Sequence, residues 1–139
     1  MTKRKELPET ITMMAVTKEK PEPGFTYKKK QLSTLLEDNE VLIKVLSASF
    51  CGTDYHIYTW DSWSQHRIKL PLTVGHELCG EIIKIGNKVS RVHLGDVVSA
   101  ETHIICNECE FCLRNEGHIC INTKIIGVDT DGCFAEYVK

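Results

Sequence analysis

The sequence lacks any apolar run long enough to cross a bilayer, and this absence excludes a membrane-spanning helix. A secretory signal peptide is not expected either, because the basic residues near the start are followed by Glu6-Leu7-Pro8-Glu9-Thr10 instead of an apolar segment. The formal net charge of −2 gives no strong field of one sign, so neither nucleic acid nor an anionic membrane is an expected partner. Two basic runs, residues 3–5 and 28–30, carry no interleaved aromatic residues, and we interpret them as solvated chain segments.

A dinucleotide-binding motif is also missing. None of the nine glycines form Gly-x-Gly-x-x-Gly, and no βαβ pattern is present to carry such a motif. A Rossmann domain is therefore not expected in this chain. The 139 residues suit one compact domain over residues 1–139, with residues 1–10 expected to be flexible.

Long amphipathic helices are absent, and short β-prone segments recur with glycine turns between them. Residues 86–88 are predicted to form a hairpin-type turn, and residues 51–72 are irregular with room for one short helix. The pattern predicts a mostly β, barrel-like domain. Its expected strands are residues 11–16, 25–27, 41–46, 81–85, 96–100 and 132–138.

The seven cysteines are an odd number, and without a secretion signal a disulfide framework is the weaker explanation. Thiols kept reduced in the cytoplasm and used for metal binding fit better. Four of them follow the spacing Cys-x2-Cys-x2-Cys-x7-Cys, which suits four thiolates around one tetrahedral zinc ion. Four protein ligands close the coordination sphere, so this zinc is expected to be structural. The ligands are Cys106, Cys109, Cys112 and Cys120.

This cluster has two alternative explanations. Unrelated buried cysteines are disfavoured because four thiols fall within fifteen residues, Cys106 to Cys120. An iron–sulfur cluster also uses tight cysteine spacing, but this spacing matches neither common ferredoxin pattern, and no proline follows the last cysteine. Zinc is the favoured ion.

A second possible metal site combines Cys51, at the end of the strand near residues 41–49, with His76, which precedes the strand at 81–85. Cysteine and histidine are both ligands that suit zinc. Two protein ligands leave coordination positions open, as a catalytic zinc requires. Taken alone, a histidine beside a glycine is more often a core or turn residue than a ligand, so His76 gains weight only together with Cys51.

Three motifs resemble those of zinc-containing medium-chain alcohol dehydrogenases, and together they cover most of residues 41–138. The motif Gly-His-Glu-x2-Gly-x5-Gly-x2-Val, which begins at Gly75, resembles the family signature. Cys51-Gly52-Thr53-Asp54 resembles the first catalytic-zinc segment, and the four-cysteine cluster resembles the structural-zinc lobe. The resemblance implies a GroES-like, partly open barrel with a structural-zinc lobe.

A narrower resemblance concerns the substrate. Residues 56–65 resemble the stretch that marks L-threonine 3-dehydrogenases, and residues 132–137 are similar to the same subfamily. The two tryptophans in the first stretch would also serve a packed surface loop. Sorbitol, butanediol or a similar alcohol is the alternative substrate, and a non-catalytic zinc-binding module is the alternative outside enzymes.

The resemblance implies NAD-dependent oxidation of a secondary alcohol, with L-threonine giving 2-amino-3-oxobutanoate. Cys51 and His76 would hold the catalytic zinc, and Glu77 would either ligate it, alternate with water, or orient the site. Thr53 would accept the proton of the substrate hydroxyl, and His56 would pass it to solvent.

The same resemblance places part of the active enzyme outside this chain. NAD and the remaining zinc ligation would come from a nucleotide-binding domain, so the 139 residues alone are expected to be inactive. The full-length enzyme is expected to be a cytoplasmic homo-oligomer.

Overall fold

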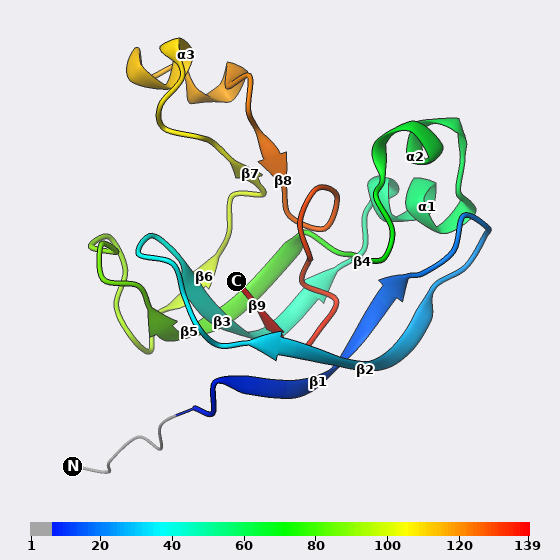
Figure 1. Cartoon of the computed structure of the whole chain (residues 1–139), viewed down its shortest axis with the longest axis horizontal. Helices are drawn as coiled ribbons and strands as arrows, with labels where there is room; N and C mark the ends of the chain where they lie inside the picture. Colours follow the sequence, from blue (N-terminus) through cyan, green and yellow to red (C-terminus); the bar gives the residue numbers. More distant parts are fainter. Residues whose placement is uncertain (1–6) are drawn as a thin grey trace.

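The computed structural model describes residues 7–139 as a mostly β fold with three short helical segments and one 3-10 turn element set around three sheets. Figure 1 shows long curved strands along one side, a helical pair at one end, and a lobe that extends away from the sheets. The elements are β1 (Thr10–Lys18), β2 (Thr26–Ser33), β3 (Val41–Ser49), α1 (Gly52–Thr59), α2 (Ser62–Arg67), β4 (Leu72–Thr73), β5 (Glu77–Ile85), β6 (Val97–Ser99), β7 (His103–Ile104), α3 (Glu110–Leu113), η1 (Gly117–Ile119), β8 (Lys124–Ile125) and β9 (Tyr137–Val138).

The strands are ordered β2-β1-β4 in one sheet, β6-β5-β3-β9 in a second and β7-β8 in a third. Within residues 7–139 all paired strands are antiparallel, so the described chain contains no parallel Rossmann sheet. The prediction of a mostly β, barrel-like domain is confirmed. No helix in the described part of the chain is long and apolar enough to span a bilayer.

Strands β3 and β5 form the main ladder of the second sheet. Their register shifts between Leu42 and Ile43 and again between Val45 and Ser47, and such bulges bend a strand and increase its twist. The bend curls the sheet toward a barrel, and the far end of β3 leads directly into α1.

Two apolar clusters form the core, and fully burying each large side chain contributes about 1.5–3 kcal/mol. One packs the second sheet against the C-terminal segment and includes Ile43, Leu78, Ile82, Ile126, Cys133 and Val138. The other fixes the helical pair against β4 and includes Ile57, Ile68, Leu72, Val74 and Val128. The second cluster therefore holds α1, the helix that follows Cys51, in a fixed position.

The predicted hairpin-type turn at residues 86–88 is present, and the two strands it separates, β5 and β6, pair antiparallel. The whole link between these strands is the longer segment 86–96. Gly86 N–H donates to the Glu40 carbonyl at 2.8 Å, and Lys88 N–H donates to the Asp38 carbonyl at 2.8 Å. The turn thus packs on the neighbouring loop, and a Cβ at Gly86 would lie 2.3 Å from the Glu37 oxygen.

The predicted strand at 132–138 is shorter than expected, since only β9 (Tyr137–Val138) has strand pairing along its length. Before it, the N–H groups of Gly132, Cys133 and Phe134 donate to carbonyls of Thr73, Gly75 and Val74. These three hydrogen bonds join two segments that are far apart in the sequence, and they do not continue as a regular strand ladder.

Residues 1–6 of the predicted flexible start lie outside the described residues. Just after them, the carbonyl of Glu9 accepts from Thr34 N–H at 2.8 Å, and the carbonyl of Pro8 accepts from the Thr34 hydroxyl at 2.7 Å. Thr10 then begins β1.

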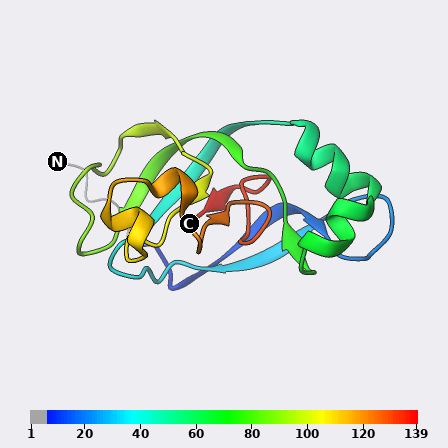
Figure 2. The same ribbon diagram turned by 90° about the horizontal axis from the view of Figure 1, so that it is seen from above.

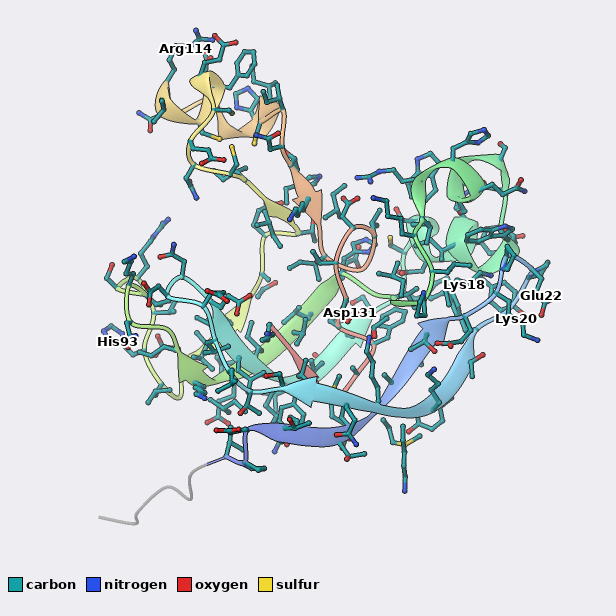
Figure 3. All side chains as sticks on the ribbon, in the orientation of Figure 1. Lys18, Lys20, Glu22, His93, Arg114 and Asp131 are labelled. Atoms are coloured by element: carbon teal, nitrogen blue, oxygen red, sulfur yellow. The ribbon has the colours of Figure 1, made fainter. Side chains whose placement is uncertain are left out.

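Lys18, at the end of β1, is completely buried. Its Nζ donates to the carbonyls of Gly24 at 3.0 Å and Tyr58 at 3.2 Å, and also to that of Glu22. The ammonium also lies 5.2 Å from the ring centroid of Trp60. Figure 3 shows Lys18 inside this corner, whereas Lys20 and Glu22 lie at its edge. One cation thus links β1, the following turn and the end of α1.

Candidate metal centres and catalytic site

The four-cysteine lobe consists of β7, α3, η1 and β8 and extends away from the sheets (Figure 1), with Arg114 labelled at its tip in Figure 3. Left-handed backbone at Asn107 (φ 60°) and Asn115 (φ 60°) turns the chain sharply on both sides of α3. Asparagine tolerates this conformation better than most side-chain-bearing residues. Cys109 is the residue that precedes α3, so a helix start and two tight turns direct the thiols inward.

The sulfurs of Cys106, Cys109, Cys112 and Cys120 lie within 4.8 Å of one another. Individual distances are 3.9 Å from Cys106 to Cys112, 3.9 Å from Cys109 to Cys120 and 3.5 Å from Cys120 to Cys106. Four sulfurs around a tetrahedral zinc with Zn–S near 2.3 Å are separated by about 3.8 Å. The spacing fits zinc and is too long for disulfides, and all four cysteines are free.

Backbone hydrogen bonds lower the pKa of two of these four thiols. The N–H groups of Glu108 and Cys109 lower the pKa of the Cys106 thiol to about 6, and the Cys106 N–H lowers the pKa of Cys120. Burial, followed by hydrogen bonding to Cys109, raises the pKa of Cys112 to about 12. A metal ion among the sulfurs would stabilise all four as thiolates.

The second group is built at the junction of β3, α1 and β5. Cys51 caps α1, and its sulfur accepts a hydrogen bond from Thr53 N–H at 3.3 Å. His76 follows the turn at Gly75 and is almost fully buried. Its Nε2 lies 3.0 Å from the Cys51 sulfur, so the fold brings the two predicted zinc ligands together.

Three glycines fix the backbone beside His76. Gly75 has φ of +90°, and a Cβ there would lie 2.3 Å from the Phe134 ring. Added Cβ atoms at Gly127 and Gly132 would lie 2.3 Å and 2.0 Å from the Gly75 oxygen. Only glycine allows three backbone segments to approach this closely. This contact, which we call the glycine contact, holds the turn that carries His76.

Asp54 is a site residue that the sequence analysis did not single out. Its carboxylate is completely buried, and Oδ2 accepts from Cys51 N–H at 3.0 Å. Oδ1 lies 3.9 Å from His76 Nδ1, and neither of these two atoms has a hydrogen-bond partner within residues 7–139.

The position of Asp54 indicates its role. Its Oδ1 faces the ring nitrogen of His76 opposite to the one near Cys51, where a carboxylate orients a histidine ligand. A sequence signal for Asp54 exists, because an acidic residue three positions after a helix cap forms a capping box. The fit of Cys51, Asp54 and His76 to one cation is supported by their donor atoms, which lie within 4.8 Å of one another.

Glu77 occupies a different environment from His76. It begins β5 with an exposed side chain, and its carboxylate is not part of the group formed by Cys51, Asp54 and His76. Its backbone carbonyl accepts from the Cys133 thiol at 3.5 Å. Direct ligation by Glu77 stays a prediction.

The two predicted proton carriers lie on α1. Thr53 and His56 are three residues apart, which places them on the same face of a helix. Together with Trp63 of α2 they line a cavity of about 220 Å³. The fold thus gathers Thr53 and His56 around one small cavity close to Cys51.

Comparisons with known proteins agree with this architecture. The model of the alcohol dehydrogenase GroES-like domain matches residues 37–139. The solved alcohol dehydrogenase of the archaeon Aeropyrum pernix superposes with a TM-score of 0.80 at 26% identity, covering 90% of this chain and 36% of that one. Galactitol-1-phosphate dehydrogenase from Escherichia coli gives a TM-score of 0.79 at 28% identity, with coverages of 91% and 35%. The chain belongs to the alcohol dehydrogenase GroES-like domain family.

Its curated relatives include L-threonine 3-dehydrogenases. The chain is 56% identical to that of Symbiobacterium thermophilum over 127 residues, covering 91% of this chain and 36% of the relative. It is 59% identical to that of Bacillus subtilis over 104 residues, covering 75% of this chain and 30% of the relative. The chain therefore spans about a third of the length of the curated relatives it matches.

Proposed function

We propose that residues 1–139 form the zinc-binding catalytic domain of an NAD-dependent secondary-alcohol dehydrogenase that oxidises L-threonine to 2-amino-3-oxobutanoate. The observation that carries the proposal is the 3.0 Å approach of Cys51 Sγ to His76 Nε2 next to helix α1. The relatives named L-threonine 3-dehydrogenase support the choice of substrate.

Two zinc ions have different tasks in this proposal. One zinc ion stabilises the lobe, whose described short elements bury no large apolar core of their own. It is held by Cys106, Cys109, Cys112 and Cys120. Cys51 and His76 hold the other, which as a Lewis acid lowers the pKa of a bound alcohol when present. Asp54 keeps the His76 ring in its orientation, and Glu77 stands at the edge of the site as a further ligand or orienting group.

The remaining chemistry belongs to residues of α1. The Thr53 hydroxyl accepts the proton of the substrate hydroxyl and donates its own proton to His56. His56, with more than half of its side chain exposed, releases the proton to solvent. NAD, which a nucleotide-binding domain of the longer protein would hold, would be the hydride acceptor.

Several broader features belong to the same proposal. All seven cysteines are free, which suits the reducing cytoplasm. We expect the complete enzyme to be a homo-oligomer with a small-molecule alcohol as substrate, and no nucleic-acid or membrane partner. A polyol such as sorbitol, or butanediol, is the second candidate substrate, because a solved galactitol-1-phosphate dehydrogenase shares the fold.

A substrate panel tests the proposed activity. NAD reduction is measured for a longer protein that contains this chain and a nucleotide-binding domain, with L-threonine, sorbitol and 2,3-butanediol. We expect L-threonine to give the highest kcat/KM and the 139-residue chain alone to give none. A higher kcat/KM with a polyol contradicts the substrate, and enzyme-like turnover by the chain alone contradicts the domain assignment.

A further inference from the structure

His56 has a carboxylate partner from the neighbouring helix. Its Nδ1 lies 2.6 Å from Oδ2 of Asp61, the residue that precedes α2. The His56 ring also meets Tyr55 and Trp63 edge to face, each with a centroid distance of 6.4 Å. The ring is thus held by aromatic contacts and by one short hydrogen bond, although its side chain is 56% exposed.

Asp61 uses its two oxygens for two different purposes. Oδ1 accepts from Ser64 N–H at 3.0 Å and caps α2, and Oδ2 faces His56. The hydrogen bond from the Ser64 backbone, followed by that from His56, holds the pKa of Asp61 below its usual range. The cap therefore fixes both the position and the charge of the carboxylate.

The charge of this carboxylate determines the tautomer of His56. An ionised carboxylate only accepts hydrogen bonds, so the 2.6 Å contact requires a proton on Nδ1. A neutral imidazole carries one proton, which leaves Nε2 as an acceptor. No hydrogen bond to Nε2 is found within residues 7–139, and the side chain lines the cavity shared with Thr53.

We propose that Asp61 is a positioning residue that keeps His56 in the Nδ1–H tautomer, with Nε2 free to accept a proton from the Thr53 hydroxyl. The inference rests on the proposed function, because that function supplies the proton to be moved. On transfer, the Thr53 O–H bond breaks and an Nε2–H bond forms. His56 becomes an imidazolium next to the negative charge of Asp61, and the proton then leaves Nε2 for water.

The substitution Asp61→Asn is the decisive test. An asparagine can still cap α2 with its oxygen, which leaves its NH₂ group facing His56 Nδ1. The amide would then donate where the carboxylate accepted. The ¹⁵N shifts of the His56 ring, recorded on the zinc-loaded 139-residue chain, are expected to show Nδ1–H in the parent and a reversal to Nε2–H in Asp61→Asn.

Two internal controls separate this effect from a loss of structure. His66 Nδ1 contacts the Ser62 carbonyl within α2, so its tautomer reports whether that helix survives. Glu101→Gln changes another carboxylate paired with an exposed histidine, His103, away from the cavity. We expect His66 to keep its tautomer in both variants and His56 to keep its own in Glu101→Gln. An Nδ1–H proton that persists on His56 in Asp61→Asn overturns the proposal.

A kinetic measurement on the longer dehydrogenase completes the test. Asp61→Asn is expected to lower kcat by about a hundred-fold, with a much smaller change in KM for the alcohol. Tautomer reversal with unchanged kcat overturns the role of Asp61 in proton transfer. The tautomer measurement needs no turnover, so a parent enzyme inactive toward every alcohol contradicts the proposed function and leaves the result on His56 intact.

Discussion

At the scale of single residues, Asp54 contacts both candidate zinc ligands, since Oδ2 accepts from Cys51 N–H and Oδ1 faces His76 Nδ1. It is a completely buried carboxylate with one oxygen lacking a hydrogen-bond partner within residues 7–139. Such a group costs free energy unless a nearby positive charge or donor compensates it. A cation held by His76 would provide that compensation, which is why we expect Asp54 to favour metal binding at this site.

We predict that Asp54→Asn weakens binding of Co²⁺, used as a probe for zinc, at Cys51 and His76 by about 10- to 100-fold. The asparagine oxygen can still cap Cys51 N–H, but its NH₂ group would face His76 Nδ1 and no longer orient the ring as a ligand. The measurement is a Co²⁺ titration of the chain whose four-cysteine lobe is already filled with zinc. Binding is monitored by the thiolate-to-cobalt absorption band.

Glu77→Gln is the matched control for this prediction, since it neutralises an exposed carboxylate one residue from His76. We expect it to change Co²⁺ affinity of the 139-residue chain less than Asp54→Asn does. The opposite order would make Glu77 the principal partner of the metal.

At the scale of secondary-structure elements, the corner around Lys18 joins β1 to the helical pair. Its Nζ is held by carbonyls from the turn after β1 and from Tyr58 in α1. Burial lowers the pKa of Lys18. The unfolded chain therefore binds more protons than the folded chain just below the ordinary lysine pKa, and the Lys18 contribution to stability increases as pH rises toward that value.

We predict that Lys18→Met lowers the free energy of unfolding by about 2–4 kcal/mol at neutral pH. It leaves the carbonyls of Glu22 and Gly24 without their donor and removes one of the two hydrogen bonds to the Tyr58 carbonyl. From pH 8 to 10 the difference from the parent should widen, because the parent gains stability that the variant cannot gain. Urea unfolding of both proteins, with zinc held constant, measures both effects.

Lys20→Met serves as its control, since the exposed pair of Lys20 with Glu22 contributes little to stability. Equal losses in the two variants, or a difference that narrows with pH, would contradict the assigned role of Lys18.

At the scale of the whole molecule, the four-cysteine lobe and the barrel are two separate parts of one chain. Seen from above in Figure 2, the lobe lies over the sheets while α1 and α2 stand at one end. Leu113 and Ile121 of the lobe are about 70% exposed, so apolar packing contributes little to its stability. We therefore expect the folded structure of the lobe to depend on a metal ion held by its four cysteine sulfurs.

We predict that Cys106→Ser removes the tightly held zinc, about one per chain, and increases hydrogen exchange mainly in residues 103–125. Metal analysis and amide exchange by mass spectrometry measure these two effects. Cys79→Ser, at a half-buried cysteine outside both metal groups, should retain the zinc. Full zinc retention in Cys106→Ser would contradict the structural site.

The sequence predicted the parts of this molecule that depend on local pattern. In strands such as β3, apolar residues alternate with polar ones or follow one another over several positions. The four cysteines that indicate a metal site lie within fifteen residues of sequence. The short β9 and the long link 86–96 were not predictable, because they depend on backbone hydrogen bonds to distant parts of the chain. Residues 132–134 bond to residues 73–75, and Gly86 and Lys88 bond to the loop at residues 38–40. Asp54 and Asp61 were missed for a related reason. A carboxylate at the start of a helix has many possible partners, and only the fold shows which histidine it meets.

The glycine contact has a consequence for how this domain tolerates change. Most cores shift slightly when one side chain is exchanged for another of different volume, and the shift passes to neighbouring groups. Gly127 and Gly132 approach Gly75 through main-chain atoms, and the side chain of Phe134 packs against Gly75, so the backbone position of His76 depends on few side-chain volumes. We therefore expect substitutions in the surrounding barrel, or around the cavity lined by Thr53, His56 and Trp63, to leave the backbone position of His76 largely unchanged.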